Sequence, residues 1–360
     1  MKFIKPFDGA MFGSVAGKIS GNSLIVEFTL SAEPGRSITI NKVPASENNS
    51  VYTATIQLDG YRNTVEAYDT VSGESETAVV YWLKNADYKY RLSLDDNIWC
   101  LQDIAKNQHI YSSLFENPLL GFYKSVHDKY GTKIHMNIYN DCPEFCGFTL
   151  AEFPDKYKDE FIANSDWFKL AFHAARNLPD RIYENSSYEE VRDDMLMVYE
   201  QIVRFAGEET LSRDVTTIHW GCATKYGVRA MRTMGIRALL ASFRAFDDGT
   251  SDINLHLNYE QTKHVHTYLA YKDHAEDMIC VANDLYLNGF TPEGIRQRLD
   301  SRETDFPQRR FKDLLMHEQY FYPFYVAYEP DFRERVITGV EWCVEHGYKP
   351  AFLKEILFED

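Results

Sequence analysis

The first 86 residues alternate apolar and polar positions with the two-residue period of β-strands. The runs Leu24–Leu30 and Tyr52–Leu58 show this alternation most clearly. Turn-forming residues separate the runs, including Glu33-Pro34-Gly35, Asp59-Gly60 and Ser72-Gly73. Short strands, frequent turns and no helical period together predict a small all-β sandwich of immunoglobulin-like type over residues 1–86.

From residue 87 the pattern changes to short apolar runs separated by longer segments of helical period. One helix begins at the capping box Ser187-x-x-Glu190. The polar stretch Asp247–Glu276, which includes His264 and His266, is predicted to form turns at the surface. Strands alternating with helices indicate an α/β fold with a parallel sheet, here an incomplete seven-stranded (β/α) barrel over residues 87–360. The predicted strands are Tyr90–Leu94, Lys133–Ile138, Phe168–Phe172, Thr216–Ile218, Arg237–Phe243, Lys312–Met316 and Pro350–Leu353.

Composition narrows the classes of partner. The 360 residues carry 38 Lys+Arg against 54 Asp+Glu, a net charge of −16 that argues against nucleic acid and anionic membranes. Aromatic residues make up 14 % of the chain, too many for a disordered protein, and they either fill a core or line a carbohydrate site.

The chain also gives expectations about its compartment. It opens without an apolar run of signal-peptide length, and no run reaches the roughly 18 residues of a membrane span. Of the six cysteines only Cys142 and Cys146 are close together, which is a weak metal pattern. Free thiols, a cytoplasmic location and no membrane association are therefore expected. The sequence does not indicate how many subunits the protein has.

Several predicted strands end in side chains that can bind metal or move protons. Asp95-Asp96-Asn97 follows the first strand of the second half, and His173, His219 and His317 follow three others. Catalytic groups of (β/α) barrels gather at these strand ends, so the set predicts a divalent-metal hydrolytic site. Adjacent aspartates suit it, because one can bind the metal while the other accepts a proton. An alternative use of Asp96 or Asn97 is as the N-cap of a helix over Ile98–Asn107.

These motifs resemble the polysaccharide deacetylase family, the NodB-like carbohydrate esterases. The family's T-F-D-D-G motif is similar to Ser93-Leu94-Asp95-Asp96-Asn97, and its H-[S/T]-x-x-H motif to His173-Ala174-Ala175-Arg176-Asn177. Its L-x-H motif matches Leu315-Met316-His317, and Ile218-His219-Trp220-Gly221 parallels its R-P-P-Y-G strand. The resemblance covers residues 88–355, and the N-terminal sandwich resembles accessory domains joined to such enzymes.

The resemblance implies a NodB-like barrel that removes an acetyl group from an N-acetylated saccharide, a hydrolysis of a carbon–nitrogen bond. Asp95 would be the general base and His317 the general acid. Asp96 and His173 would be metal ligands, with Asn177 at the position of the second family histidine and His219 as a replacement imidazole. The implied metal is a divalent ion, zinc in the family; because Asn177 replaces a histidine, both its identity and its affinity are open.

Aromatic and acidic residues near these motifs are candidates for substrate binding: Trp220, Glu318, Tyr320 and Tyr322. Two other functions remain open. A glycoside hydrolase would use Glu208 or Glu318 together with Asp95 and would not need a metal. A non-catalytic carbohydrate-binding protein would keep the barrel without the metal.

Overall fold

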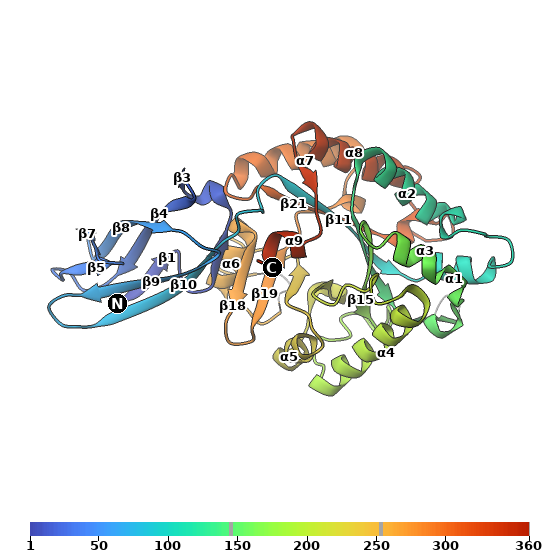
Figure 1. The fold of residues 1–360 in the computed structure, drawn as a ribbon, viewed down its shortest axis with the longest axis horizontal. Helices are drawn as coiled ribbons and strands as arrows, with labels where there is room; N and C mark the ends of the chain where they lie inside the picture. The colour runs from blue at the N-terminus through green and yellow to red at the C-terminus, as the bar shows by residue number, and fades with distance from the viewer. Residues whose placement is uncertain (144–146, 252–254, 360) are drawn as a thin grey trace.

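The computed structural model describes residues 1–143, 147–251 and 255–359, so Cys146, the second cysteine of the weak metal pattern, lies outside the described residues. The fold is mixed α/β and is built mainly on three sheets (Figure 1). In the N-terminal part, a five-stranded sheet has the order β1-β4-β8-β7, with β3 on β4. Its strands are β1 (Lys2–Lys5), β3 (Lys18–Ser20), β4 (Ser23–Ser31), β7 (Ser46–Asn48) and β8 (Val51–Leu58).

A nine-stranded sheet runs from the N-terminal part into the second half. Its order is β16-β17-β19-β18-β2-β10-β9-β5-β6. The strands are β2 (Ala10–Phe12), β5 (Ile38–Ile40), β6 (Val43–Pro44), β9 (Arg62–Asp69), β10 (Ser75–Trp82), β16 (Val215–Thr217), β17 (Ala238–Ala241), β18 (Ala270–Asp273) and β19 (Met278–Ala282).

The third sheet carries most of the predicted barrel strands, in the order β15-β12-β11-β21-β20, with β22 also on β11. All of its pairings are parallel. The strands are β11 (Lys89–Asn97), β12 (Ile134–Tyr139), β15 (Phe168–Ala174), β20 (Leu285–Tyr286), β21 (Phe311–His317) and β22 (Lys349–Pro350).

Helices cover the outside of this parallel core. In Figure 1, α7 and α8 lie above β21 and β11, whereas α4 and α5 lie below β15. The prediction from Ser187 is confirmed, because its side chain accepts from the Glu190 amide and α4 begins at the next residue. The helices are α1 (Trp99–Lys106), α2 (Pro118–Tyr130), α3 (Lys158–Ala163), α4 (Tyr188–Ala206), α5 (Lys225–Thr233), α6 (Tyr259–Tyr268), α7 (Pro292–Asp305), α8 (Phe332–Glu345) and α9 (Lys354–Leu357).

The α/β class is as predicted, but the described residues do not form one closed, hydrogen-bonded barrel. The parallel strands divide between two sheets. An isolated parallel bridge pairs Leu170 of β15 with Leu211, which lies shortly before β16. The strands that end the two sheets are short, with three residues in β16 and two in β20, and offer little backbone for further pairing.

The two halves are joined by one short strand. Met11 in β2 pairs with Ala270 in β18, and on its other side β2 runs parallel to β10. The N-terminal strands share their own buried cluster, which includes Phe28, Ile56 and Val80. Immunoglobulin-like type and the boundary at residue 86 stay predictions, and the nine-stranded sheet crosses that boundary.

The stretch Asp247–Glu276 corrects one expectation. It contains α6 and β18 rather than surface turns alone. His264 is buried, with its Nε2 at 3.2 Å from both the amide nitrogen and the carbonyl oxygen of Met11. The polar composition concealed these elements because α6 has a narrow buried face, in which Thr262 and His264 occupy positions normally held by apolar residues.

A buried ion pair connects neighbouring strands at the base of the parallel sheet. The Arg91 guanidinium donates to Asp313 at 2.7 Å and to Nδ1 of His135 at 2.9 Å. All three side chains are buried, and burial raises the pKa of Asp313 to about 6 against the opposing effect of Arg91.

Replacing Arg91 tests this arrangement. We expect Arg91→Met to lower the free energy of unfolding by about 3–5 kcal/mol, because it leaves Asp313 buried without its partner. Urea denaturation measures the loss. The control is Arg296→Met, which breaks an exposed pair with Glu345 and should cost less than about 1 kcal/mol. Equal losses in the two variants would contradict the structural role of Arg91.

Candidate functional site

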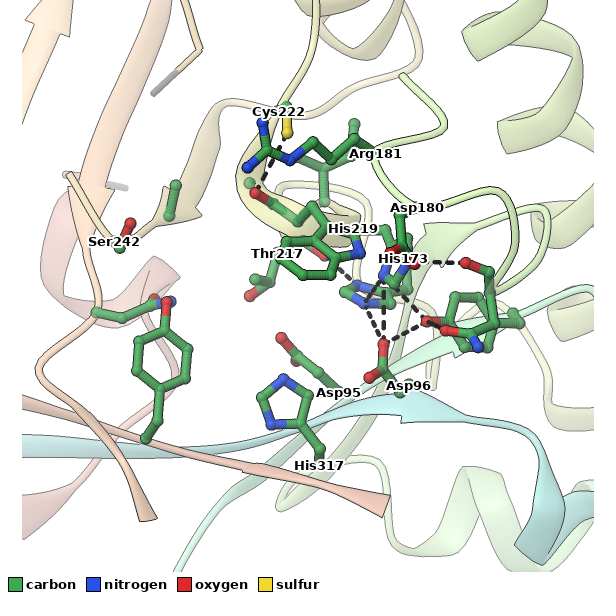
Figure 2. A pocket seen from close by; sticks show the side chains of 18 of the residues that line it. Asp95, Asp96, His173, Asp180, Arg181, Thr217, His219, Cys222, Ser242 and His317 are labelled. Carbon is green, nitrogen blue, oxygen red and sulfur yellow. Dashed lines mark hydrogen bonds and ion pairs between the residues drawn. The ribbon is translucent and has the colours of Figure 1, made fainter. Parts of the chain in front are cut away.

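The candidate site lies at the carboxyl ends of the parallel strands, as the sequence predicts. It is a pocket of about 1210 Å³ whose lining includes Asp95, Asp96, His173, His219 and His317 (Figure 2). Asp95 and Asp96 end β11, His173 is on β15, His219 follows β16, and His317 ends β21. Asp95 and His317 are register partners on adjacent strands, so they flank one side of the pocket together.

A bulge at the end of β11 sets the directions of the two aspartates. The pairing of β11 with β12 shifts register between Leu94 and Asn97, and Asp96 adopts a left-handed φ of 63°. The side-chain Nδ2 of Asn97 donates to the backbone carbonyl oxygens of Leu94 at 2.6 Å and Asn137 at 2.7 Å. Asn97 therefore stabilises the bulge at the position where the family motif has glycine.

Asp96, His173 and His219 form the cluster that could hold a metal ion. Their ligand atoms lie within 4.8 Å of one another. Asp96 Oδ1 is 3.0 Å from His173 Nε2 and 3.3 Å from His219 Nδ1, and these two nitrogens are 3.2 Å apart. Figure 2 shows the three side chains converging on one point.

Carbonyl oxygens behind the histidines indicate which ring nitrogens can bind a cation. His173 Nδ1 is 2.5 Å from the Thr217 carbonyl, and His219 Nε2 is 3.0 Å from the Asn177 carbonyl. A carbonyl only accepts, so each of these outer nitrogens carries a proton, and each inner nitrogen faces Asp96 either as a donor, when it is protonated, or with a lone pair. Two lone pairs and a carboxylate facing one another need a proton or a cation between them, so the donor set fits a divalent ion.

The electrostatics of the cluster follow from its hydrogen bonds. Burial alone would raise the pKa of Asp96, but the bonds to His173 and His219 and the nearby His317 hold it well below its usual range. Burial likewise would lower the pKa of His173, but its bond to Asp96 and the charges of Asp95 and Asp96 raise it. The cluster thus retains a carboxylate charge in a buried place.

Asn177 lies beside this cluster but is tied to a different neighbour. Its Oδ1 lies 3.1 Å from the Tyr139 hydroxyl oxygen, and its backbone carbonyl holds His219. The one proton of the Tyr139 hydroxyl is donated to the charged Asp96 carboxylate, and the hydroxyl oxygen lies 3.0 Å from His219 Nδ1. Burial, together with the charge of Asp96, raises the pKa of Tyr139 well above its usual value, so it remains a donor.

Asp95 and His317 each have one side held by an asparagine. Asn137 Nδ2 donates to Asp95 Oδ1 at 2.6 Å, which leaves Oδ2 to accept a proton. His317 Nδ1 is 2.8 Å from Asn288 Oδ1, so Nδ1 carries a proton and Nε2 is the nitrogen left for the pocket. Neither asparagine was predicted from the sequence. Asn137 lies on a predicted strand, one residue before its end, whereas no sequence pattern pointed to Asn288.

Two of the four predicted substrate-binding residues lie elsewhere, which corrects their assignment. Glu318 is fully buried, and its carboxylate accepts from the amides of Ile98, Trp99 and Cys100 at 2.5–2.9 Å. A carboxylate stabilises a helix N-terminus, so Glu318 serves α1 in the place expected for Asp96 or Asn97. Tyr322 donates to Glu318 at 3.0 Å and does not line the pocket.

Trp220 and Tyr320 do line the pocket. Trp220 is 46 % exposed, has a left-handed φ of 59°, and has the Arg181 guanidinium 5.7 Å from its ring centre. Asp180, Arg181, Glu184 and Arg244 also line the pocket, on loops whose sequence carried no recognisable motif. Glu208 lies outside it, in an exposed ion pair with Arg213.

Comparisons with known proteins do not assign a family. No family model matches the sequence, and no curated protein matches it. The crystal structure of 4-alpha-glucanotransferase from Thermococcus litoralis is similar with a TM-score of 0.49 and 12 % identity, over 76 % of this chain and 40 % of that one. That of a putative alpha-galactosidase/melibiase from Bacteroides fragilis gives a TM-score of 0.18 and 10 % identity, over 66 % of this chain and 57 % of that one.

This chain therefore spans less than two thirds of either protein, and both likenesses are too weak to assign a function. Neither protein is named as a deacetylase. Among the helices that the structure describes, none has the length and apolar character needed to cross a membrane. The five cysteines described, Cys100, Cys142, Cys222, Cys280 and Cys343, are buried, and none of them forms a disulfide with another described residue.

Metal titration tests the cluster directly. We expect one zinc ion per chain by calorimetry and elemental analysis, with binding lost in His173→Ala and His219→Ala. Tyr139→Phe, which removes a donor to Asp96, should weaken binding by about 10- to 100-fold. The exposed His109→Ala is the matched control and should bind normally.

The same titration has a defined pH dependence. Protons compete with the ion for His173, and the pKa of that side chain is raised above 6.5, so affinity should fall as pH decreases through that raised pKa. Stoichiometric zinc in the His173→Ala/His219→Ala double variant would show that the ion binds elsewhere.

Proposed function

We propose that this protein is a metal-dependent hydrolase that removes an acetyl group from an N-acetylated saccharide. The observation that carries the proposal is the pairing of a buried Asp-His-His cluster with Asp95 and His317 at the same pocket. Asp96, His173 and His219 would hold the ion, and this nitrogen and oxygen donor set suits zinc. When bound, the ion would polarise an acyl carbonyl and acidify water.

The chain's own residues supply the proton transfers. Asp95 is fixed through Oδ1 by Asn137, so its Oδ2 is placed to take a proton from the attacking water. His317 is fixed through Nδ1 by Asn288, so a protonated ring would donate from Nε2 to the leaving amine. Because Asp95 and His317 are register partners on adjacent strands, one substrate bond could reach both.

A second candidate is a glycoside hydrolase. The pocket lining includes Asp180 and Glu184 besides Asp95, and cleavage of a glycosidic bond requires two carboxylates across the scissile bond. Glu208 and Glu318 are not available for that pair, because one is in an exposed ion pair and the other is buried at α1. The glycosidase would release a reducing sugar and keep its activity after metal removal.

Asp95→Asn tests whether the pocket catalyses a reaction or only binds a saccharide. We expect it to lower kcat/KM for acetate release by about 10²- to 10⁴-fold while zinc binding is preserved, because Asn cannot accept the proton. Acetate and reducing ends are measured on N-acetylated oligosaccharides before and after chelation. Full activity in Asp95→Asn would contradict the mechanism, and reducing ends formed in the presence of chelator would favour the glycosidase.

Asn288 gives a prediction about the acid. Asn288→Ala should lower kcat/KM on the order of 10²-fold, because His317 loses the partner that orients it. Asn288→Asp keeps an oxygen acceptor for the Nδ1 proton and should retain more activity than Asn288→Ala. The ¹⁵N NMR shifts of His317 report the ring tautomer independently of turnover. An unchanged tautomer and unchanged kcat/KM in Asn288→Ala would contradict this role.

A further inference from the structure

The loop between β21 and α8 forms an aromatic wall on one side of the pocket. We call residues 320–328 the aromatic loop; their sequence, Tyr-Phe-Tyr-Pro-Phe-Tyr-Val-Ala-Tyr, contains no charged residue. Tyr320 and Tyr325 line the pocket together with Trp99. The loop is therefore continuous with the site described above.

Beyond the pocket lining, the aromatic loop exposes large apolar side chains. Phe324 is 70 % exposed and Val326 is 97 % exposed, within three residues of each other. Neither side chain lines the pocket itself, but the two flank Tyr325, which does. Single exposed apolar residues are common, but two beside a pocket-lining residue indicate a surface that is buried when a ligand binds.

The loop is held in place rather than loosely attached. Trp99, at the start of α1, has its ring centre 5.0 Å from that of Phe324 and 5.9 Å from that of Tyr325. Backbone amides of Tyr325, Tyr328 and Glu329 donate to carbonyls within the loop at 2.9–3.1 Å. Glu329 is also paired with Arg335 of α8 at 2.5 Å. A preorganised apolar surface loses little conformational entropy on binding.

The chemistry of this wall differs from that of the opposite one. Around Trp220 the pocket has Asp180, Arg181 and Glu184, which can hydrogen-bond to hydroxyl groups. Phe324 and Val326 offer no polar side-chain atom, and burying the hydroxyls of a sugar ring without partners is costly. An apolar group fits this wall better than a further sugar ring does.

We propose that Phe324 and Val326 bind an alkyl or aryl group attached to the saccharide that occupies the pocket. The inference rests on the proposed function only in that the pocket takes a saccharide. The pocket volume of about 1210 Å³ exceeds the ~300–1000 Å³ of most small-molecule sites, so a sugar has room there, with its substituent extending past Tyr325 to Phe324 and Val326.

Paired glycosides test the proposal by calorimetry, without any turnover. The probes are methyl and octyl N-acetyl-β-glucosaminide, used below the micelle concentration of the octyl compound. We expect the octyl glycoside to bind wild-type protein about 10- to 100-fold more tightly, because several methylene groups leave water. In Phe324→Ala/Val326→Ser this ratio should fall below about 3-fold while affinity for the methyl glycoside is unchanged.

The control variant is Val71→Ser, which removes an 81 % exposed apolar side chain in the N-terminal part and should keep the full ratio. An unchanged ratio in the double variant overturns the proposal, as does equal binding of the two glycosides or binding of neither. Stronger binding of N,N′-diacetylchitobiose than of the octyl glycoside, lost in the double variant, would assign the wall to a second sugar ring instead.

The outcome is distinguishable from a failure of the proposed function. The affinity ratio is also measured in Asp95→Asn, in which no acetate release is expected. A preserved ratio with no turnover in wild-type protein would support the apolar wall and contradict the deacetylase. Acetate release by wild-type protein, together with an affinity ratio that the loop variant does not change, would support the deacetylase and contradict the apolar wall.

Discussion

The bulge at the end of β11 is the constraint on which the rest of the site depends. Successive side chains of a regular strand point to opposite faces, so only one of two adjacent aspartates would face the pocket. The register shift and the left-handed backbone of Asp96 bring both carboxylates to the same pocket. Such backbone costs about 1–3 kcal/mol and persists only where neighbours determine it, here through the two hydrogen bonds from Asn97.

The same point of the chain is fixed from the other side by Glu318. Its carboxylate binds the first amides of α1 directly after the bulge, which ties the end of β21 to the start of that helix. His317 precedes Glu318, and the aromatic loop follows it. One buried carboxylate therefore helps to place the predicted acid, the paired aspartates and the outer wall relative to one another.

Different sides of the pocket carry different kinds of side chain. Buried ligand nitrogens meet at Asp96, amides fix Asp95 and His317, polar groups surround Trp220, and apolar rings form the far wall. Each reactive side chain has its other polar atom held by a carbonyl or an amide. This restricts the tautomer of the histidines and the direction of Asp95, which is what a preorganised site requires.

Sequence patterns predicted which polar residues lie at the strand ends, but they did not predict the contacts that these residues make. Asp95, Asp96, His173, His219 and His317 were found because polar residues after apolar runs are visible in one dimension. The role of Glu318 was missed, since an acidic residue next to a catalytic candidate gives no sign that it points to a helix start. Asn137, Tyr139 and Asn288 became apparent only from distances in the folded chain, and α6 and β18 were hidden in a polar stretch. The division of the parallel strands between two sheets also depends on pairing that no local pattern encodes.

The central claim is that Asp96, His173 and His219 hold one metal ion. Crystals grown with zinc and measured at its absorption edge would test this most directly. The account predicts a single strong anomalous peak within bonding distance of Asp96 Oδ1, His173 Nε2 and His219 Nδ1. A peak only at another imidazole–carboxylate pair, such as His256 and Asp273, or no peak at the cluster, would contradict it.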